Sequence, residues 1–232
     1  MTDRRLQPVH AIAVELAELA AALASLVATA TLEPYGIEAG ALAIDARHEA
    51  GLHPDESAII ELAVARRRAE FATGRALLRG LIGAPGPVLT LTSRAPSVPL
   101  GVVASLAHDR EFAVAAVHRN AATRGGPHVV ALGIDIEPAG SVDTESAAVV
   151  LRPDEQSLDP TMAFVAKEAA YKAWSTSGGA VLDHADVRIT CSPGDLPQEF
   201  AAEFLGTSTI VRGVFTRTST RWLALAVLDA PR

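Results

Sequence analysis

Short strand-like segments occur in two groups along this sequence, and one long helix accompanies each group. The first group spans residues 41–45, 88–92, 102–106 and 112–117, with a helix expected at 54–82. The second spans residues 129–136, 187–190, 209–216 and 222–228, with a helix expected at 161–175. We therefore expect an α+β fold: a pseudo-twofold pair of similar α+β halves, each a long helix packed on a small, mostly antiparallel sheet.

The polar stretch 120–127, which ends in Gly125-Gly126-Pro127, is the best candidate for a boundary between the halves. We expect an N-terminal half over residues 1–122 and a C-terminal half over residues 123–232. Ahead of the first strand, an alanine-rich segment predicts an amphipathic helix packed on the body of the protein. Its charge-free run, 19–32, is shorter than the roughly 20 apolar residues of a membrane-spanning helix, so we expect no membrane partner.

Charge and cysteine content narrow the functional classes. Twenty Lys+Arg residues against 27 Asp+Glu residues give a net charge of −7, which disfavours a general nucleic-acid binder. The single cysteine, Cys191, excludes an internal disulfide and a cysteine-based zinc site. A reducing, cytoplasmic location is the simplest expectation for such a chain, and we expect a monomer.

Two acidic side chains project from one face at the end of the expected strand 129–136. Strand residues alternate between faces, so one side is apolar and carries Val130, Leu132, Ile134 and Ile136. The other side carries Val129, Ala131, Gly133, Asp135 and Glu137, and the glycine leaves room for a bulky neighbour. Paired carboxylates suit Mg²⁺, which binds hard oxygen ligands together with substrate phosphates. The alternative is two acids that face water at a strand end.

A Lys-Glu motif lies on the second long helix. Phe164, Glu168 and Lys172 are spaced four residues apart and share one face, which borders the core because Phe164 is apolar. A carboxylate there could complete a metal site or accept a proton, and the lysines could neutralise phosphate. An ordinary Glu–Lys surface pair would explain the same spacing.

Arginines gather on the first long helix, as Arg66-Arg67-Arg68 followed by Arg75 and Arg79. At about 100° per residue, Arg68, Arg75 and Arg79 fall within about 40° of one another, whereas Arg67 lies about 80° from Arg75. Such a stripe could bind a terminal phosphate by forked hydrogen bonds, or it could be a solvated basic face balanced by nearby glutamates.

Ser105 and His108 stand at the end of the expected strand 102–106 and are followed by Asp109. A serine–histidine nucleophile pair is conceivable, but no G-x-S-x-G elbow surrounds Ser105, which argues against a hydrolase. A hydrogen-bonded structural histidine is the alternative for His108.

The order of these motifs is more specific than any one of them. The segments R-R-R-A-E-F-A-T-G-R at 66–75, S-L-A-H at 105–108, G-I-D-I-E-P at 133–138 and F-V-A-K-E-A-A-Y-K-A-W at 164–174 resemble the Sfp-type 4′-phosphopantetheinyl transferases. Among them, the branch that serves siderophore and polyketide pathways is the most similar. The resemblance implies coenzyme A in the cleft between the halves. It also implies transfer of the phosphopantetheine arm to a serine of an apo acyl or peptidyl carrier protein, with release of adenosine 3′,5′-bisphosphate.

The resemblance further implies a metal and a base. Asp135, Glu137 and Glu168 match the family's Mg²⁺ ligands, and Mn²⁺ could replace Mg²⁺. Glu168 also matches the residue usually proposed as the base for the serine hydroxyl, acting directly or through a water. Lys167 and Lys172 match lysines near the pyrophosphate, and Lys172 is placed to stabilise developing charge.

The phosphate-binding residues follow from the same resemblance. Arg67 and Arg75 match arginines that hold the 3′-phosphate of the coenzyme, and Ser105 with His108 matches the phosphate-binding turn. The 80° offset between the two arginines implies that the helix begins later than residue 54, that it bends, or that Arg68 is the ligand.

Two departures from the family pattern concern the anion site. The family's lysine before a G-x-P turn is missing from S-R-A-P at 93–96, where only Arg94 is nearby. The S-x-T-H turn has lost a hydroxyl and is followed by Asp109 and Glu111. We expect both changes to weaken binding of the coenzyme more than they affect the chemistry.

Two other functions remain open at this point. One is a degenerate member that binds coenzyme A or a carrier protein without transfer, which the intact Asp135, Glu137, Glu168 and Lys172 disfavour. The other is a Mg²⁺-dependent nucleotide pyrophosphatase that uses water as the nucleophile.

Overall fold

The computed structural model of the chain describes residues 6–91, 95–120, 128–191 and 193–230. The longer helices are α1 (Leu6–Val27), α3 (Ala65–Ile82) and α5 (Pro160–Thr176), and the short ones are α2 (Pro54–Ile60) and α4 (Thr144–Val150). The strands are β1 (Glu38–Ala43), β2 (Val102–His108), β3 (Phe112–Arg119), β4 (Val129–Pro138), β5 (Val187–Cys191), β6 (Gln198–Phe204), β7 (Ile210–Arg217) and β8 (Arg221–Asp229). Short 3₁₀ helices at Glu33–Tyr35, Ala46–Gly51, Pro153–Glu155 and His184–Asp186 lie in the connections among the described residues.

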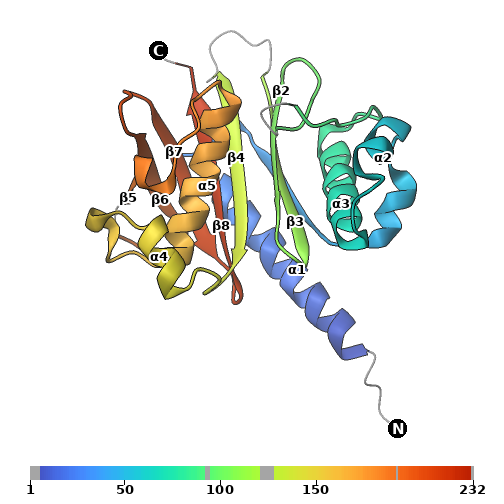
Figure 1. Cartoon of the computed structure of the whole chain (residues 1–232), viewed down its shortest axis with the longest axis horizontal. Coiled ribbons are helices and arrows are strands. Elements are labelled where there is room, and N and C mark those ends of the chain that lie inside the picture. Colours follow the sequence, from blue (N-terminus) through green and yellow to red (C-terminus); the bar gives the residue numbers. More distant parts are fainter. Residues whose placement is uncertain (1–5, 92–94, 121–127, 192, 231–232) are drawn as a thin grey trace.

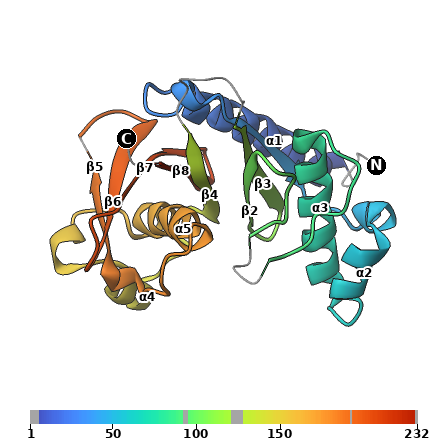
Figure 2. The ribbon, with the colours of Figure 1, turned by 90° about the horizontal axis from the view of Figure 1, so that it is seen from above.

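Two antiparallel sheets form the framework (Figure 1). The first has the strand order β1-β3-β2, and the second has the order β4-β8-β7-β6-β5. Strands β2 and β4 lie side by side at the centre of the molecule, with α3 and α5 on the two outer sides (Figure 2). The expected α+β fold, in which one long helix packs on each small antiparallel sheet, is confirmed.

The two faces of β3 pack against different partners, because its side chains alternate and nearly all of them are buried. Ala113, Ala115 and Val117 face α3, where they meet Leu77 and Leu78. The opposite face contributes to a second core that both sheets share. That core comprises Phe112, Val114 and Ala116 of β3, Leu132, Ile134 and Ile136 of β4, and Val214, Leu223, Leu225 and Val227 of β7 and β8.

Helix α1 packs along one side of this shared core, as the amphipathic pattern of its sequence predicts. Leu19, Leu23 and Leu26 are almost completely buried, whereas Ala20, Ala21 and Ala24 between them are exposed. By length and composition alone, the stretch His10–Val27 is apolar enough to cross a membrane, a criterion that core helices of soluble proteins and signal sequences also meet. Its carboxylates pair with the β7–β8 turn, where Glu18 accepts a hydrogen bond from the Ser219 amide at 3.1 Å.

Helix α5 covers the outer face of the five-stranded sheet and lies directly on β4. A Cβ atom on Gly133 would stand 1.7 Å from the carbonyl oxygen of Ala169, so only glycine permits this approach. The bulky neighbour that the glycine was expected to accommodate is therefore the backbone of α5.

Several predicted elements differ from those observed. The helix predicted over 54–82 is two helices, because the chain turns at 61–64 and Val64 adopts an extended conformation before α3. The strand predicted over 88–92 is not a sheet strand in its described residues. The Val88 amide donates to Glu56 Oε1 instead of to a strand. Among the described residues, the segment forms one isolated antiparallel bridge, Thr90 with Pro96, in which the Leu91 amide donates to the Ala95 carbonyl.

Three smaller differences concern strand limits. The strand expected at 41–45 is β1, which ends at Ala43, because Asp45 caps the following 3₁₀ turn through the Arg47 amide. Strand β6 was not predicted. The register of β4 shifts between Val129 and Ala131, so Val130 is 40% exposed and Val129 joins the apolar face instead. The proposed boundary at 122/123 lies outside the described residues.

Candidate active site

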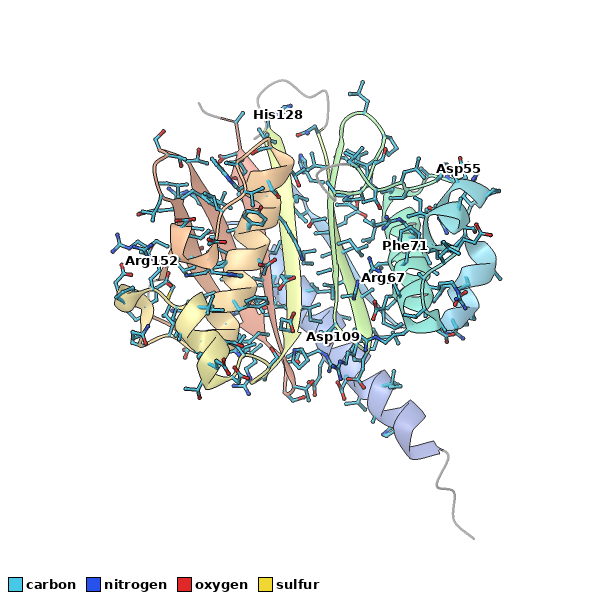
Figure 3. The ribbon with its side chains drawn as sticks, viewed as in Figure 1. Asp55, Arg67, Phe71, Asp109, His128 and Arg152 are labelled. Atoms are coloured by element: carbon cyan, nitrogen blue, oxygen red, sulfur yellow. The ribbon has the colours of Figure 1, made fainter. Side chains whose placement is uncertain are left out.

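A cavity of about 460 Å³ lies between the two halves, with α3 on one side and α5 on the other. Strand β2 also contributes to its lining, as do Thr90, Ala95 and Pro96. The polar groups that line the cavity are Arg67, Glu70, Arg75, Thr90, Ser105, His108, Glu168, Tyr171, Lys172, Ser175 and Thr176. Figure 3 labels Arg67 and Phe71 on the helix that forms the first side. Most of the predicted site residues thus meet at one cavity.

Arg75 is a buried cation that lines this cavity. The residue is only 5% exposed, its guanidinium stacks on the Phe71 ring at 4.1 Å, and it donates to Thr90 Oγ1 at 2.7 Å. Its Nε has no hydrogen-bond partner among the described residues. Burial lowers the pKa of Arg75 to about 10, so the side chain stays protonated at neutral pH. A buried arginine with an unused donor favours an anionic ligand.

Arg67 and His108 form a second polar pair at the cavity, in which Arg67 carries the positive charge. Arg67 donates to His108 Nε2 at 2.8 Å, and because arginine only donates, the histidine proton must lie on Nδ1, which donates to the Asp109 carbonyl. Burial lowers the pKa of His108, in opposition to that hydrogen bond and to Glu70, so the ring is neutral at pH 7. Arg68, by contrast, pairs with Glu49 at 3.0 Å. Of the alternatives raised by the helix offset, the structure has the later helix start, with Arg67 rather than Arg68 at the cavity.

Ser105 joins the two halves while lining the same cavity. Its Oγ accepts a hydrogen bond from the Ile134 amide of β4 at 3.1 Å, and the residue is 5% exposed. The bond uses an acceptor site of the hydroxyl and leaves its proton available to a ligand. His108 does not bond to Ser105, so the structure gives no support to a nucleophilic pair.

Asp135 and Lys172 connect β4 to α5 beside the cavity. Lys172 Nζ lies 2.6 Å from Asp135 Oδ1 and 2.9 Å from the Ile134 carbonyl. The other carboxylate oxygen, Oδ2, is buried and has no hydrogen-bond partner among the described residues. Burial raises the pKa of Asp135 to about 6, against the attraction of Lys172 and with added repulsion from Glu168.

The other two predicted acids, Glu137 and Glu168, lie close enough to Asp135 to interact with its charge. Burial, together with repulsion from Asp135 and Asp109, raises the pKa of Glu137 to about 7. Burial would also raise the pKa of Glu168, but a hydrogen bond from His184 at 3.0 Å and the nearby Lys172 lower it below its ordinary value. Glu168 is therefore ionised at neutral pH.

These carboxylates have the chemistry that a divalent cation prefers, although their oxygens do not converge on one point. Within the described ranges, no group of three or more acidic, histidine or cysteine side chains is arranged to hold a metal ion. The buried, unpartnered Oδ2 of Asp135 nevertheless identifies an excess of buried negative charge, as do the pKa values of Asp135 and Glu137, which burial raises and neighbouring carboxylates raise further. A hard cation coordinated by Asp135, Glu137 and Glu168 would relieve that excess.

Asp135 and Glu137 do not line this cavity, and Glu137 instead lines a neighbouring one together with His108 and Asp109. Lys167 lines neither of the two cavities. Its side chain is 1% exposed, and its Nζ bonds to Glu155 at 2.6 Å and to the carbonyls of Val150 and His184. Three partners use all the donors of an ammonium group. The assignment of Lys167 to the pyrophosphate therefore has no support in this arrangement, in which the residue joins α5 to the segments on either side of it.

The structure adds site residues that the sequence analysis did not select. Thr90 anchors Arg75, and Tyr171, the residue before Lys172, also lines the cavity. His184 both bonds Glu168 and stacks on Phe164 with ring centroids 5.2 Å apart. Tyr171 lies within the Lys-Glu motif and was a visible candidate. Thr90 and His184 come from segments without a local signal, so only the fold brings them to the site.

The acidic residues that follow His108 have a cationic partner of their own. Asp109 and Glu111 both pair with Arg221 of β8, and the Asp109 bond measures 2.6 Å. The expectation that these acids weaken the site overlooked this partner, which lies far away in the sequence. Arg94 falls outside the described residues, so the effect of the missing lysine remains a prediction.

The fold and the cavity define an α+β enzyme. Arginine, histidine and lysine side chains line its cavity, and buried carboxylates lie close to them. Comparison with known proteins agrees: the 4′-phosphopantetheinyl transferase N-terminal domain family matches residues 55–118. The 4′-phosphopantetheinyl transferase Svp of Streptomyces mobaraensis is 34% identical over 178 residues, which cover 70% of this chain and 69% of that protein.

Two further relatives are similar over somewhat shorter stretches. The 4′-phosphopantetheinyl transferase Npt of Nocardia iowensis is 32% identical over 62% of this chain and 68% of its own. The 4′-phosphopantetheinyl transferase PptT of Mycobacterium tuberculosis is 32% identical over 59% of this chain and 64% of its own. The chain belongs to the 4′-phosphopantetheinyl transferase family, and it is a transferase.

Proposed function

We propose that this enzyme transfers the 4′-phosphopantetheine arm of coenzyme A to a serine of an apo acyl or peptidyl carrier protein, with Mg²⁺ as the metal. Adenosine 3′,5′-bisphosphate is the second product. The observation that carries the proposal is the single cavity that has cations on α3, hydrogen-bonding groups on β2 and, across it, Lys172 and Glu168 next to the buried Asp135. Phosphoryl transfer needs these parts, because the protein mainly positions the groups and neutralises charge.

The cationic side of the cavity accounts for coenzyme binding. Arg75 and Arg67 would hold the 3′-phosphate, since a guanidinium matches phosphate oxygens with paired hydrogen bonds. Ser105 and the neutral His108 would contribute hydrogen bonds to phosphate oxygens. Lys172, which is 29% exposed and lines the cavity, would offset charge on the pyrophosphate as its bridging bond breaks.

The acidic side accounts for the reaction. Asp135, Glu137 and Glu168 would hold Mg²⁺, which supplies charge neutralisation at the phosphate oxygens. Glu168, ionised at neutral pH, would accept the proton of the carrier serine directly or through a water while the serine Oγ forms its bond to the β-phosphorus. The bond from that phosphorus to the bridging oxygen breaks, and the electron pair leaves with adenosine 3′,5′-bisphosphate.

One assay tests the proposal. The protein is incubated with coenzyme A, Mg²⁺ and an apo carrier protein, and the carrier is weighed by mass spectrometry. A gain equal to the phosphopantetheine group supports transfer. Release of adenosine 3′,5′-bisphosphate without a carrier would favour a pyrophosphatase. Binding of coenzyme A with no mass gain on any carrier would contradict the proposal.

The metal assignment is tested with Asp135→Asn, which keeps the size of the side chain and removes its charge. We expect transfer to fall at least about 100-fold, and binding of Mn²⁺ followed by electron paramagnetic resonance to weaken in parallel. Glu203→Gln, a change to an exposed acid on β6, is the matched control and should alter neither. Normal Mn²⁺ binding by folded Asp135→Asn would refute the assignment.

A further inference from the structure

Arg221 is a buried cation at which three parts of the fold meet. It begins β8, its side chain is 3% exposed, and its Nε bonds to Asp109 Oδ2 at 2.6 Å. The same guanidinium pairs with Glu15 of α1 and Glu111 of the β2–β3 turn, and it lies 4.4 Å from the centroid of the Phe112 ring. One side chain of the five-stranded sheet therefore contacts both α1 and the three-stranded sheet.

Asp109, the main partner of Arg221, determines the shape of the turn that follows His108. Its Oδ1 accepts hydrogen bonds from the amides of Glu111 and Phe112, both at 2.7 Å. Its backbone carbonyl accepts the Nδ1–H of His108 at 3.2 Å. In Figure 3, Asp109 lies at the end of the central strands, below Arg67. The contacts run in sequence from Arg221 through Asp109 and His108 to Arg67.

Only an arginine suits this position. The Asp109 carboxylate is 2% exposed, and a buried carboxylate without a cationic partner is strongly unfavourable. A planar guanidinium can bond to three acids at once, whereas the compact ammonium of lysine has neither the reach nor the fork. The place of the β2–β3 turn relative to β4 and its acids thus depends on a residue from the opposite half.

We propose that Arg221 is a positioning residue of the coenzyme site. Through Asp109 it holds His108 and Arg67 at the distance from the acids of β4 that one coenzyme molecule requires. The inference rests on the proposed function, because it takes the cavity between the halves to bind coenzyme A. It extends that function to a residue that does not itself line the cavity.

The test uses Arg221→Gln in the full-length protein, with Arg188→Gln, an exposed arginine on β5, as the matched control. Removal of a charged hydrogen bond that orients the site should raise KM for coenzyme A about tenfold or more, while kcat stays within about twofold. Arg188→Gln should change neither value. An unchanged KM in folded Arg221→Gln would overturn the inference.

Asp109→Asn breaks the same link from the other side and keeps the acceptor for the two turn amides. It leaves no unpaired buried carboxylate, so it serves as the test if Arg221→Gln does not fold, as judged by circular dichroism. The same rise in KM is expected. A normal KM for this variant would equally overturn the inference.

A double-variant cycle separates positioning from general destabilisation. If Arg221 acts through His108, the double variant Arg221→Gln/His108→Ala should have the same KM as His108→Ala alone. If the two substitutions instead multiply each other's effect on KM, the role of Arg221 is merely structural and the inference is overturned.

If the wild-type protein modifies no carrier, the proposed function itself fails. If the wild-type protein is active and the Arg221→Gln variant has a normal KM, only the positioning role is refuted.

Discussion

At the scale of single residues, Arg75 combines burial, a neighbouring aromatic ring and an unused donor. Arg75 is only 5% exposed, and its guanidinium contacts Thr90 and the Phe71 ring. The negative charge of Glu56 favours its protonated form. Such an arrangement is costly unless a ligand supplies the missing negative charge. The residue is therefore the most informative single test of how the coenzyme is bound.

We predict that Arg75→Ala raises KM for coenzyme A by about 10- to 100-fold, because a charged hydrogen bond contributes about 1.5–3 kcal/mol. The effect should be much smaller with 3′-dephospho-coenzyme A, which lacks the phosphate that Arg75 would hold. Steady-state kinetics with both substrates measure the difference. Arg68→Ala, on the same helix but paired with Glu49, is the control and should leave both KM values unchanged. An equal loss with both substrates would contradict the contact.

Six of the nine site residues predicted from the sequence line one cavity, and helix geometry explains why Lys167 does not. Glu168 and Lys172 are four residues apart and both line the cavity. Lys167 lies five residues from Lys172, which is about 140° around the helix, so the two lysines cannot face one ligand. The partners of Asp109 and Glu168, which are Arg221 and His184, are remote in sequence and could be found only from the fold.

At the scale of elements, the close approach of α5 to β4 depends on Gly133. We predict that Gly133→Ala destabilises the protein by about 1–3 kcal/mol or more, because a Cβ there would overlap the Ala169 carbonyl. It should also reduce transfer, since the helix that carries Glu168 would be displaced. Gly80→Ala, in α3 with open space around its Cβ, should instead stabilise by about 0.5–1 kcal/mol. Urea denaturation measures both; equal effects would show that packing against α5 is unimportant.

The junction of α2 and α3 depends on a buried carboxylate. Glu56 accepts hydrogen bonds from the amides of His53 and Val88 and pairs with Arg79 at 2.6 Å. Burial opposes ionisation, but these bonds and the Arg79 charge outweigh it and lower the pKa of Glu56 below 4.5. The stabilisation is therefore complete above about pH 4.5 and is lost as the pH falls through the lower, folded-state pKa.

We predict that Glu56→Gln lowers the free energy of unfolding by about 2 kcal/mol at pH 7, or roughly 4–8 °C in Tm. The difference from wild type should shrink below about pH 4.5, as the wild-type carboxylate becomes protonated. Thermal denaturation followed at several pH values measures this. Glu61→Gln, at an exposed position just after α2, is the control and should behave as wild type. A gap that stays constant down to pH 3 would refute the role of the charge.

Element limits were less predictable than element types. No glycine or proline marks the turn at 61–64, so the sequence reads as one continuous helix from Pro54. Strand β6 carries a clear alternation, with Phe200, Ala202 and Phe204 buried, which a closer reading of the period would have found. The strand expected at 88–92 was lost because its Val88 amide bonds to Glu56, a tertiary contact with no local signal.

At the scale of the whole molecule, the two halves are not independent bodies. One core contains buried side chains from α1, from the three-stranded sheet and from the five-stranded sheet. The ion pair between Arg221 and Asp109 and the bond between Ser105 and the Ile134 amide join the two sheets through polar contacts. A cavity between halves that share a core keeps its shape without a ligand, which favours a preformed coenzyme site.

We predict that the chain unfolds in one cooperative transition, because removing either half would expose the shared core. Both tryptophans, Trp174 and Trp222, lie in the C-terminal half, so their fluorescence reports that half, whereas far-ultraviolet circular dichroism reports the helices of both. The two urea midpoints should coincide. A fragment of residues 1–120 should show no cooperative transition of its own, since the face of β3 that bears Phe112 and Val114 would be left without β4 and β8. Separate midpoints, together with a folded fragment, would instead show that the chain is two domains that merely meet at the cavity.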